Sequence, residues 1–283
     1  MSAGVRFAGV IGFPISHSLS PRLHAFWLRQ QGICGYYVPI ASTAENFSES
    51  VRILQQAGFA GVNVTVPHKE SAYAVADRLD LAARTIGAAN LLLFNGDEIE
   101  GRNTDVAGLW ESLKEEFDTA MFAESVAAVL GTGGAARAAV AALSELGFHE
   151  IRVLGRNLAR AQGLVAELGP RVKAAVIALD WENWHRAAAG ASLLVNATSA
   201  GMHKAAQLEL SLEPLPKAAA VYDLVYNPLE TALVKRARSR GHRAAGGLGM
   251  LVHQAVPAFQ SFFGGTPADI RGARAELEKA LAE

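Results

Sequence analysis

Short apolar runs alternate along the chain with longer stretches in which apolar residues recur every three or four positions. The short runs, which are typical of strands, lie near residues 6–11, 35–39, 61–64, 89–94, 125–130, 151–154, 193–196 and 219–223. The longer stretches have helical spacing, most clearly at 109–117, 248–263 and 271–281. Strands that alternate with helices are typical of parallel sheets covered by helices. The pattern therefore predicts an α/β protein, with a helix at 109–117 that links a first α/β unit to a second, doubly wound one.

Length and composition fit two such domains. The chain has 283 residues, of which 51% are hydrophobic, and a formal net charge of -1. Near-neutral charge without long Lys/Arg runs argues against nucleic acid or an anionic membrane as the main partner. The sequence shows neither an apolar stretch long enough to span a bilayer nor a signal-peptide pattern, so we expect a cytoplasmic protein. The single cysteine, Cys34, excludes an internal disulfide and a thiolate metal cage, and no metal site is expected.

The run Gly131-Thr132-Gly133-Gly134-Ala135-Ala136-Arg137 follows an apolar strand and opens into an alanine-rich helix. A dinucleotide site needs small residues at the tight turn, where the backbone meets the pyrophosphate, and where the helix packs on its strand. Gly131, Gly133 and Ala136 fit these three positions. The helix would direct free N–H groups and its positive dipole end at the phosphates. The run therefore predicts a dinucleotide site.

The next strand, at 151–154, indicates which dinucleotide is bound, because its carboxyl end faces the adenosine ribose. An NAD site usually has an acidic residue there, whereas this chain has Arg156, Asn157 and Arg160 after Gly155. A guanidinium can bind a ribose 2'-phosphate through two parallel charge-assisted hydrogen bonds. NADP is therefore favoured. The alternative is that Arg156 and Arg160 are simply solvated residues at a helix start.

Hydroxyl side chains precede the first predicted helix. Ser18 and Ser20 lie in a turn just before Pro21, where the helix begins. Hydroxyls and free N–H groups at a helix start suit a carboxylate ligand. The alternative is that Ser20 only caps the helix, with Pro21 as its first residue.

A lysine follows the predicted strand at 61–64. Asn63 and Thr65 fall on one face by strand alternation, and Lys69 comes at the start of the next helix. A lysine beside a positive helix end in a partly dry cleft loses some preference for its charged form and can exchange protons. The alternative is an exposed surface lysine. We interpret His68 as structural.

Further polar residues flank a predicted hairpin and a late helix. Asn90 can donate to and accept from a hydroxylated ligand. Asp105 ends the segment Gly101-Arg102-Asn103-Thr104-Asp105, just before the linking helix, where two domains would face each other across a cleft. An N-cap is the competing explanation for Asp105. Gln254 is an amide on an otherwise apolar helix.

In order and spacing, eight segments resemble the shikimate dehydrogenase family, over nearly the whole chain. They are SHSLSP, NVTVPHK, GAAN, GRNTD, GTGGAAR, NATSAGM, YDLVYNP and GGLGMLVHQA. The resemblance implies an N-terminal α/β substrate domain of residues 1–105, completed by a C-terminal helical segment, 247–283, that returns to it. Residues 106–246 would form a doubly wound Rossmann domain that binds NADP. The implied activity is the reversible NADP-dependent reduction of 3-dehydroshikimate to shikimate, in the pathway to chorismate and aromatic amino acids.

The same resemblance implies roles for individual residues. Lys69 and Asp105 match the catalytic pair, in which an ammonium would stabilise charge on the carbonyl oxygen and supply the proton. Residues implied to hold the substrate are Ser18, Ser20, Thr65, Asn90, Tyr226 and Gln254, besides Asp105. Residues implied to hold the cofactor are Gly131, Gly133, Gly134, Ala135, Ala136, Arg156, Asn157, Arg160, Thr198, Gly247 and Met250.

Some positions depart from the family pattern. Gly155 stands where Asn is common in NADP-using members, Thr132 where Ala is usual, and Leu91 where Thr often follows the Asn. None of these changes removes a catalytic group. Two alternatives stay open, namely a quinate/shikimate dehydrogenase that uses NAD and a non-catalytic nucleotide-sensing protein on the same fold. We expect a small-molecule substrate as partner and a monomer or homodimer.

Overall fold

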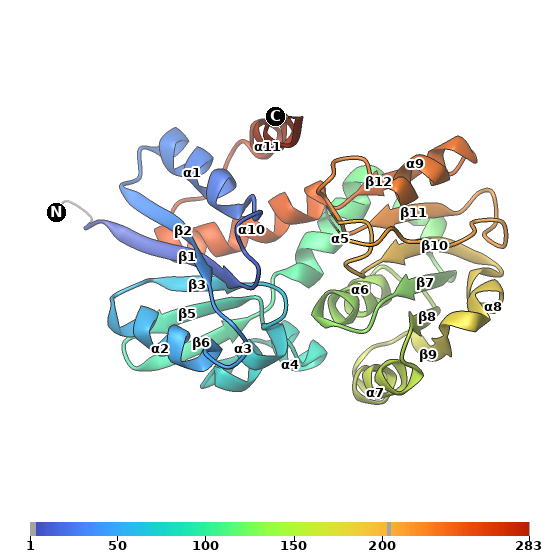
Figure 1. Ribbon diagram of the computed structural model, residues 1–283, viewed down its shortest axis with the longest axis horizontal. Coiled ribbons are helices and arrows are strands. Elements are labelled where there is room, and N and C mark those ends of the chain that lie inside the picture. The colour runs from blue at the N-terminus through green and yellow to red at the C-terminus, as the bar shows by residue number, and fades with distance from the viewer. Residues whose placement is uncertain (1–3, 203–204, 283) are drawn as a thin grey trace. The chain divides into compact units, whose positions relative to one another are not determined.

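The computed structural model describes residues 4–202 and 205–282, and the chain divides into two compact units (Figure 1). Unit 1 comprises Met1–Asp105 and Val252–Glu283, and unit 2 comprises Val106–Leu251. The predicted α/β class is confirmed, and the C-terminal segment belongs to unit 1. We expected its return at residue 247. The boundary lies at Val252 instead, inside a helix that begins at Leu248.

Unit 1 is built around a six-stranded mixed sheet in the order β2-β1-β3-β5-β6-β4. Its strands are β1 (Arg6–Gly12), β2 (Gly35–Ala41), β3 (Gly61–Val64), β4 (Arg78–Leu79), β5 (Leu91–Asn95) and β6 (Glu98–Arg102). β1 pairs in parallel with β2 and β3, whereas β5 is antiparallel to β3 and β6. β3 is buried along its whole length, so its one polar residue, Asn63, requires a partner inside the protein.

Helices cover both faces of this sheet. They are α1 (Ser20–Gln31), α2 (Phe47–Gln56), α3 (Lys69–Val75), α4 (Leu81–Ile86), α10 (Leu248–Phe263) and α11 (Ile270–Ala282). Val62 and Val64 of β3 join a core cluster with apolar residues of α2, α3 and α4. Because side chains alternate along a strand, Asn63 faces the opposite side, on which α1 and α10 pack. There Trp27 of α1 meets Phe259 of α10, with ring centroids 5.5 Å apart.

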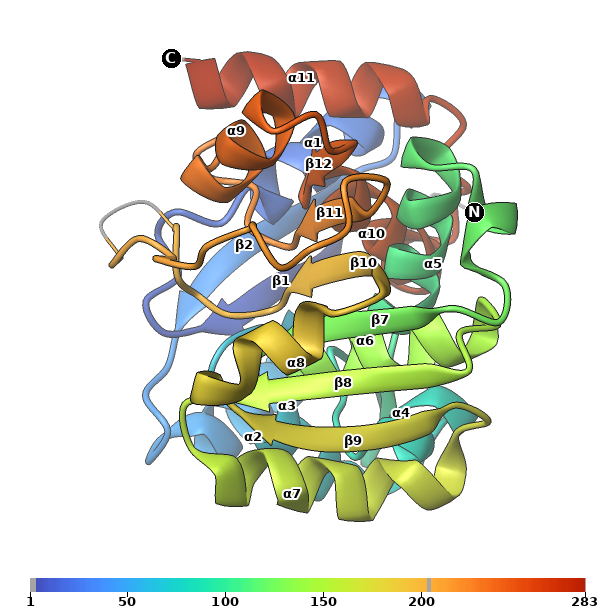
Figure 2. The same cartoon turned by 90° about the vertical axis from the view of Figure 1, so that its right-hand side faces the viewer.

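Unit 2 contains a six-stranded parallel sheet in the order β12-β11-β10-β7-β8-β9, with its strands running the same way (Figure 2). Its strands are β7 (Val126–Leu130), β8 (Glu150–Gly155), β9 (Ala175–Asp180), β10 (Ala191–Asn196), β11 (Ala220–Asp223) and β12 (Ala244–Gly246). Its helices are α5 (Asp105–Glu116), α6 (Gly134–Glu145), α7 (Leu158–Leu168), α8 (Trp184–Ala188) and α9 (Ala232–Ser239). Further 3-10 turns span Thr119–Phe122, Gly169–Arg171 and Trp181–Asn183.

The strand order of unit 2 reverses at β7. β8 and β9 follow on one side of it, and β10 to β12 on the other. In doubly wound sheets, ligands bind outside the carboxyl ends of the strands at this switch point. The glycine run that begins at Gly131 directly follows β7, so it lies at the position that the topology favours.

Neither a membrane-spanning helix nor a cluster of metal ligands is found along the described part of the chain. Among the described residues, no helix is long and apolar enough to cross a membrane. Within the same residues, no three His, Cys, Asp or Glu side chains gather in a way that could hold a metal ion.

Candidate active site

Lys69 and Asp105 are the first residues of α3 and α5, and their side chains meet. Lys69 Nζ lies 2.6 Å from Asp105 Oδ2, and the two side chains are only 15% and 6% exposed. Such a short pair, largely out of water, forms a strong charge-assisted hydrogen bond. The alternative interpretation of Lys69 as an exposed surface lysine is therefore wrong.

The turn before Lys69 is fixed by His68. Its ring stacks on Phe47 with centroids 4.7 Å apart, and its Nε2 lies 2.7 Å from the Ser42 carbonyl oxygen. His68 is buried. These contacts tie the start of α3 to the segment after β2, which agrees with a structural role for His68.

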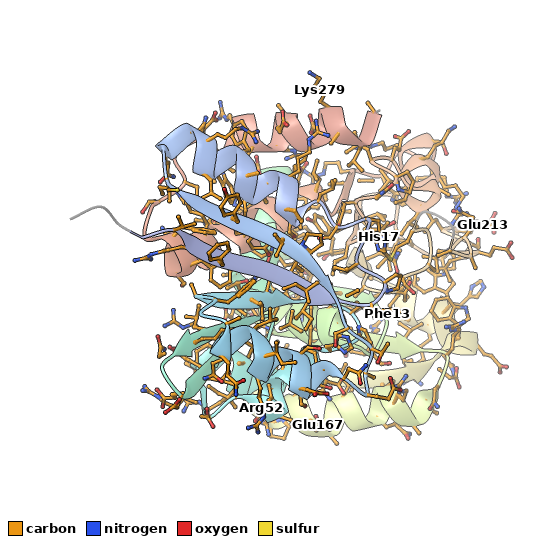
Figure 3. All side chains as sticks on the ribbon, turned by 60° about the vertical axis from the view of Figure 1, so that its left-hand side comes forward. Phe13, His17, Arg52, Glu167, Glu213 and Lys279 are labelled. Carbon is orange, nitrogen blue, oxygen red and sulfur yellow. The ribbon has the colours of Figure 1, made fainter. Side chains whose placement is uncertain are left out.

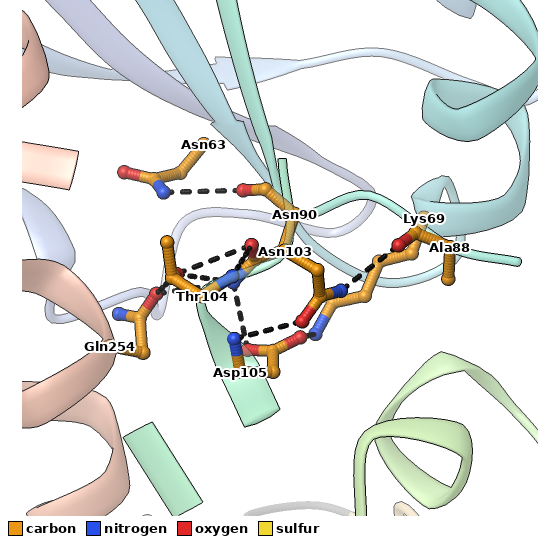
Figure 4. A network of polar contacts seen from close by, with 8 residues as sticks. All are labelled: Asn63, Lys69, Ala88, Asn90, Asn103, Thr104, Asp105 and Gln254. Atoms are coloured by element: carbon orange, nitrogen blue, oxygen red, sulfur yellow. Dashed lines mark hydrogen bonds and ion pairs between the residues drawn. The ribbon is translucent and has the colours of Figure 1, made fainter. Parts of the chain in front are cut away.

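Asn90 connects the pair to a wider polar cluster (Figure 4). Its Nδ2 donates to Asp105 Oδ1 and to Thr104 Oγ1, both at 2.9 Å, and its Oδ1 accepts from the Thr104 amide at 2.8 Å. Gln254 of α10 brings its Oε1 to 3.4 Å from Asn90 Nδ2 and from Thr104 Oγ1. The two oxygens of Asp105 thus face different partners, Lys69 on one side and Asn90 on the other.

Asp105 does not act as an N-cap, because it is itself the first residue of α5. Its amide donates to Asn103 Oδ1 at 3.0 Å, and Asn103 Nδ2 donates to the Ala88 carbonyl oxygen at 3.0 Å. Asn103 and Thr104 were not assigned to the site from the sequence, although they directly precede Asp105. Their hydrogen bonds leave the Asp105 carboxylate free to face Lys69 and Asn90.

Ser18 and Ser20 lie at the start of α1. Ser20 is the first residue of this helix, and its N-cap is Leu19, whose side chain makes no capping hydrogen bond, so the alternative in which Ser20 caps the helix is wrong. The Ser20 amide lies 3.4 Å from Ser18 Oγ. The loop between β1 and α1 leaves Phe13 and His17 exposed (Figure 3). The Ser18 and Ser20 hydroxyls both lie at the start of α1.

Thr65 directly follows β3, and its amide donates to the Ile11 carbonyl oxygen at 3.0 Å. Among the described contacts, its hydroxyl makes no hydrogen bond to Lys69, Asp105 or Asn90. The structure therefore brings Lys69, Asn90, Asp105 and Gln254 into one network and leaves Thr65 outside it.

Two residues that received no role from the sequence continue the network behind Asn90. Asn63 Nδ2 donates to the Asn90 carbonyl oxygen at 3.2 Å, and Tyr37 Oη donates to Asn63 Oδ1 at 2.7 Å. For Asn63, strand alternation was a usable signal. Tyr37 lies in an apolar strand, and nothing in the local sequence indicated a polar contact.

In unit 2, the glycine run joins β7 to α6. Gly131 has a φ of +115°, and a Cβ there would lie 2.8 Å from the Ala197 carbonyl oxygen. The close approach of these two backbone segments therefore requires glycine at position 131. Gly133 is the N-cap of α6, no side chain caps the helix, and a Cβ at Gly133 would meet open space. Residues 134–136 form the first turn. This open, uncapped helix start fits a pyrophosphate group.

The segment after β8 carries exposed cations. Arg156 and Arg160 are both exposed, and no carboxylate pairs with either among the described residues. Asn157 caps α7, since its Oδ1 accepts from the Arg160 amide at 3.2 Å. Two guanidiniums without an acidic neighbour at this strand end fit a ribose 2'-phosphate.

Gly155 is the last residue of β8, and it places no side chain at the carboxyl end of this strand. A Cβ on Gly155 would lie 2.7 Å from the Thr132 methyl carbon. The Thr132 methyl thus occupies volume that a side chain at position 155 would need, so the two departures from the family pattern are spatially coupled.

A buried network fixes the loop after β10. The amide and hydroxyl of Thr198 donate to Asn196 Oδ1 at 3.1 and 2.7 Å, and Asn196 Nδ2 donates to Asp223 Oδ1 at 2.8 Å. Burial raises the pKa of Asp223, opposed by hydrogen bonds from Thr231, Val225 and Asn196. Thr198 is thus held by the carboxyl ends of β10 and β11.

The remaining predicted site residues of unit 2 lie near the end of β12 and after β11. Gly247 approaches the segment after β11 so closely that a Cβ would lie 2.1 Å from the Leu224 carbonyl oxygen. Met250 lies in the first turn of α10 and is buried. Tyr226 follows β11 and is half-buried.

Three family models match successive parts of the chain. The model described as "Shikimate dehydrogenase substrate binding domain" matches residues 10–92, and "Shikimate / quinate 5-dehydrogenase" matches residues 111–219. "Shikimate 5'-dehydrogenase C-terminal domain" matches residues 247–278. The matched segments include the Lys69 turn, the glycine run and Gln254.

Individual relatives agree with these models. A curated "Shikimate dehydrogenase (NADP(+))" from Paramagnetospirillum magneticum is 48% identical and covers 94% of this chain and 96% of its own. A shikimate 5-dehydrogenase from Thermus thermophilus, solved with NADP(H) and shikimate, has a TM-score of 0.83 at 34% identity and covers 98% of both chains. Quinate dehydrogenase from Corynebacterium glutamicum, solved with NAD, has a TM-score of 0.87 at 28% identity and covers 98% of this chain and 100% of its own. The chain belongs to the shikimate dehydrogenase family.

Proposed function

We propose that this chain catalyses the reversible NADP-dependent reduction of 3-dehydroshikimate to shikimate, in the pathway to chorismate and aromatic amino acids. The single observation that carries the proposal is the contact of Lys69 with Asp105 inside a cluster of amide and hydroxyl groups. A polyhydroxylated ketone requires both a proton donor and several hydrogen-bond partners, and this cluster has both. The curated relatives at 44 to 48% identity carry the same activity in their names.

The proton chemistry is assigned to Lys69. Reduction of a ketone places negative charge on the carbonyl oxygen, which then takes up a proton. NADPH, when bound, supplies the hydride. The Lys69 ammonium is suited to stabilise the developing charge and to donate the proton, and Asp105 Oδ2 holds Lys69 Nζ at 2.6 Å. In the oxidative direction the same pair accepts the proton.

Substrate recognition is assigned to the groups around this pair. We propose that Asn90, Asp105 and Gln254 bind ring hydroxyls, with Thr65 and Tyr226 as further contacts. Ser18 and Ser20, at the start of α1, would bind the carboxylate through their hydroxyl hydrogens. An anionic group at a helix start is also favoured by the helix dipole.

Cofactor binding is assigned to unit 2. We propose that residues 131 and 133–136 bind the pyrophosphate, that Arg156, Asn157 and Arg160 surround the 2'-phosphate, and that Thr198, Gly247 and Met250 line the nicotinamide side. The supporting observations are the open start of α6 and the two exposed guanidiniums after β8. A cytoplasmic location and a monomeric or homodimeric state complete the proposal.

The test is to mix the purified protein with shikimate and NADP, and separately with quinate and NAD, and to follow the absorbance of the reduced cofactor. We expect turnover with shikimate and NADP, and at least a tenfold lower kcat/KM with quinate or with NAD. Preferred turnover of quinate with NAD would indicate the quinate/shikimate alternative. Absence of turnover with every pair, together with retained nucleotide binding, would indicate a nucleotide sensor.

A further inference from the structure

Asn103 is a buried residue two positions before Asp105, and the proposed reaction gives it no role. It is only 5% exposed. It lies between two elements, since β6 ends at Arg102 and α5 begins at Asp105. A buried side-chain amide requires hydrogen-bond partners inside the protein. The identity of these partners shows which parts of the structure Asn103 holds.

The two ends of the Asn103 side chain contact two different segments of backbone (Figure 4). Asn103 Oδ1 accepts from the Asp105 amide at 3.0 Å, and Asn103 Nδ2 donates to the Ala88 carbonyl oxygen at 3.0 Å. A backbone amide can only donate and a backbone carbonyl can only accept, so one orientation of the Asn103 side chain satisfies both. Asn103 therefore joins the start of α5 to the segment that follows α4.

Both of these segments carry groups of the candidate site. The Asp105 amide is among the first N–H groups of α5, which have no acceptor within the helix. By accepting from it, Asn103 fixes the backbone from which the Asp105 carboxylate extends to Lys69. Ala88 lies two residues before Asn90, whose Nδ2 donates to Asp105 Oδ1 at 2.9 Å. Asn103 thus holds the backbone on both sides of the contact between Asn90 and Asp105.

The backbone of Asn103 is itself anchored by Asp80. The Asn103 amide lies 3.3 and 3.4 Å from the two carboxylate oxygens of Asp80. Asp80 is also the N-cap of α4, since its Oδ1 accepts from the Ala83 amide at 2.7 Å. A residue outside the candidate site therefore fixes Asn103, and the Asn103 side chain can hold Asp105 in turn.

We propose that Asn103 is a positioning residue for Asp105, which acts by fixing the direction of the Asp105 carboxylate. The inference rests on the proposed function, because it takes Asp105 as a catalytic group. One oxygen of this carboxylate must face Lys69 while the other faces Asn90. Without the Asn103 side chain, the first residue of α5 loses this support and its carboxylate can turn away. A displacement of about 1 Å can lower a catalytic rate by about 10²-fold.

The decisive variant is Asn103→Ala, which removes both side-chain contacts. We expect its kcat for shikimate oxidation to fall about ten- to a hundredfold. Its calorimetric Kd for NADP should stay unchanged, because no residue assigned to the cofactor is among the contacts of Asn103 described above. Asn103→Ser should keep part of the activity, with a kcat at least about threefold above that of Asn103→Ala. A serine hydroxyl can still accept from the amide two residues later, although more weakly than an asparagine side chain does.

Asp269→Ala is the matched control for a loss of stability alone. Asp269 also supports the start of a helix in unit 1, since its Oδ1 accepts from the Gly272 amide of α11 at 2.7 Å. Its Oδ2 accepts from Gln30 at 3.0 Å. Neither partner belongs to the candidate site. We expect Asp269→Ala to have a lower melting temperature and a wild-type kcat.

A double variant separates positioning from a general structural role. If Asn103 acts through Asp105, the kcat of Asn103→Ala/Asp105→Asn is no lower than that of Asp105→Asn alone. A structural defect would instead lower kcat by the same factor with either residue at position 105. Should Asn103→Ala not fold, the same comparison is made with Asn103→Ser, whose kcat should lie about two- to fivefold below the wild type.

The outcomes are distinguishable. A wild-type kcat in the folded Asn103→Ala protein, or in Asn103→Ser where the alanine variant does not fold, would overturn the role of Asn103. Losses that multiply in the double variant would overturn it as well. A wild-type protein that does not oxidise shikimate would refute the proposed function instead.

Discussion

Lys69 Nζ and Asp105 Oδ2 lie 2.6 Å apart, and each belongs to the first residue of its helix. A carboxylate at a helix start is favoured by the helix dipole, whereas an ammonium there is disfavoured. Asp105 is therefore well placed in α5. Lys69 occupies the unfavourable end of α3, and its positive charge is compensated by the Asp105 carboxylate. A largely buried cation in this position indicates a chemical role rather than a stabilising one.

Replacing Asp105 by Asn should nearly abolish turnover. The amide keeps the shape of the side chain but removes the negative charge that holds Lys69. We expect kcat/KM for shikimate to fall by about 10²-fold or more. Steady-state kinetics measures this, with Glu111→Gln as the control, because Glu111 is a carboxylate of the same helix that is 48% exposed. Activity of Asp105→Asn within threefold of the wild type would show that the charge is not needed.

The double variant Arg156→Ala/Arg160→Ala should lose the preference for NADP over NAD. Each charge-assisted hydrogen bond to a phosphate contributes about 1.5–3 kcal/mol, so the KM for NADP should rise by at least about tenfold. The KM for NAD, which lacks the 2'-phosphate, should not change. Arg240→Ala, at an exposed arginine next to α9, serves as the control. A parallel loss with NAD and NADP would contradict the assignment.

Gly155 and Thr132 should behave as one unit. In Gly155→Ala the new methyl meets the Thr132 methyl carbon at 2.7 Å, and we expect a loss of about 1 kcal/mol or more in the free energy of unfolding. Thr132→Ser removes only that methyl, so the double variant Gly155→Ala/Thr132→Ser should regain much of the lost stability. The control is Gly163→Ala in α7, where nothing lies within 4 Å and alanine should be neutral or stabilising. Denaturant unfolding measures all three, and a Gly155→Ala protein as stable as the wild type would refute the contact.

His24 should make the protein less stable in mild acid. Burial lowers its pKa from 6.5 to about 3, so the folded state keeps it neutral while the unfolded chain takes up a proton. Its contribution to stability is present above pH 6.5 and is lost as the pH falls toward 3, by up to about 1.4 kcal/mol per pH unit.

His24→Phe tests this expectation, since phenylalanine fits the aromatic cluster but does not titrate. Between pH 7 and pH 5 the wild type should lose about 2 kcal/mol more in the free energy of unfolding than His24→Phe does. His17→Gln, at an exposed histidine, should follow the wild type. The same pH dependence in all three proteins would contradict the burial effect.

The sequence predicted most of the strands and the helices with clear apolar spacing, and it missed the strands β4, β9 and β12. Residues 61–64 and 248–263 match β3 and α10 in full. β4 has only two residues, and β12 has the sequence AAG, so neither shows a period that can be recognised. Such strands form because neighbouring strands offer pairing partners, β6 for β4 and β11 for β12.

The candidate site divides in the same way. Motifs identified Lys69, Asn90 and Asp105, because acidic, basic and amide groups at turns and helix starts stand out. Tyr37 could not be found, since its hydrogen bond to Asn63 spans two strands that are not adjacent in the sheet order. The coupling of Thr132 to Gly155 was also invisible, as the two positions were recognisable only as separate departures from the family pattern.

The central claim is that Lys69 supplies the proton chemistry of an NADP-dependent shikimate dehydrogenase, and Lys69→Ala tests it most directly. The measurement is kcat for shikimate oxidation beside the calorimetric Kd for NADP in the same preparation. We predict that kcat falls by about 10²- to 10⁴-fold while the Kd for NADP stays within twofold of the wild type. Near-normal turnover in Lys69→Ala would contradict the account.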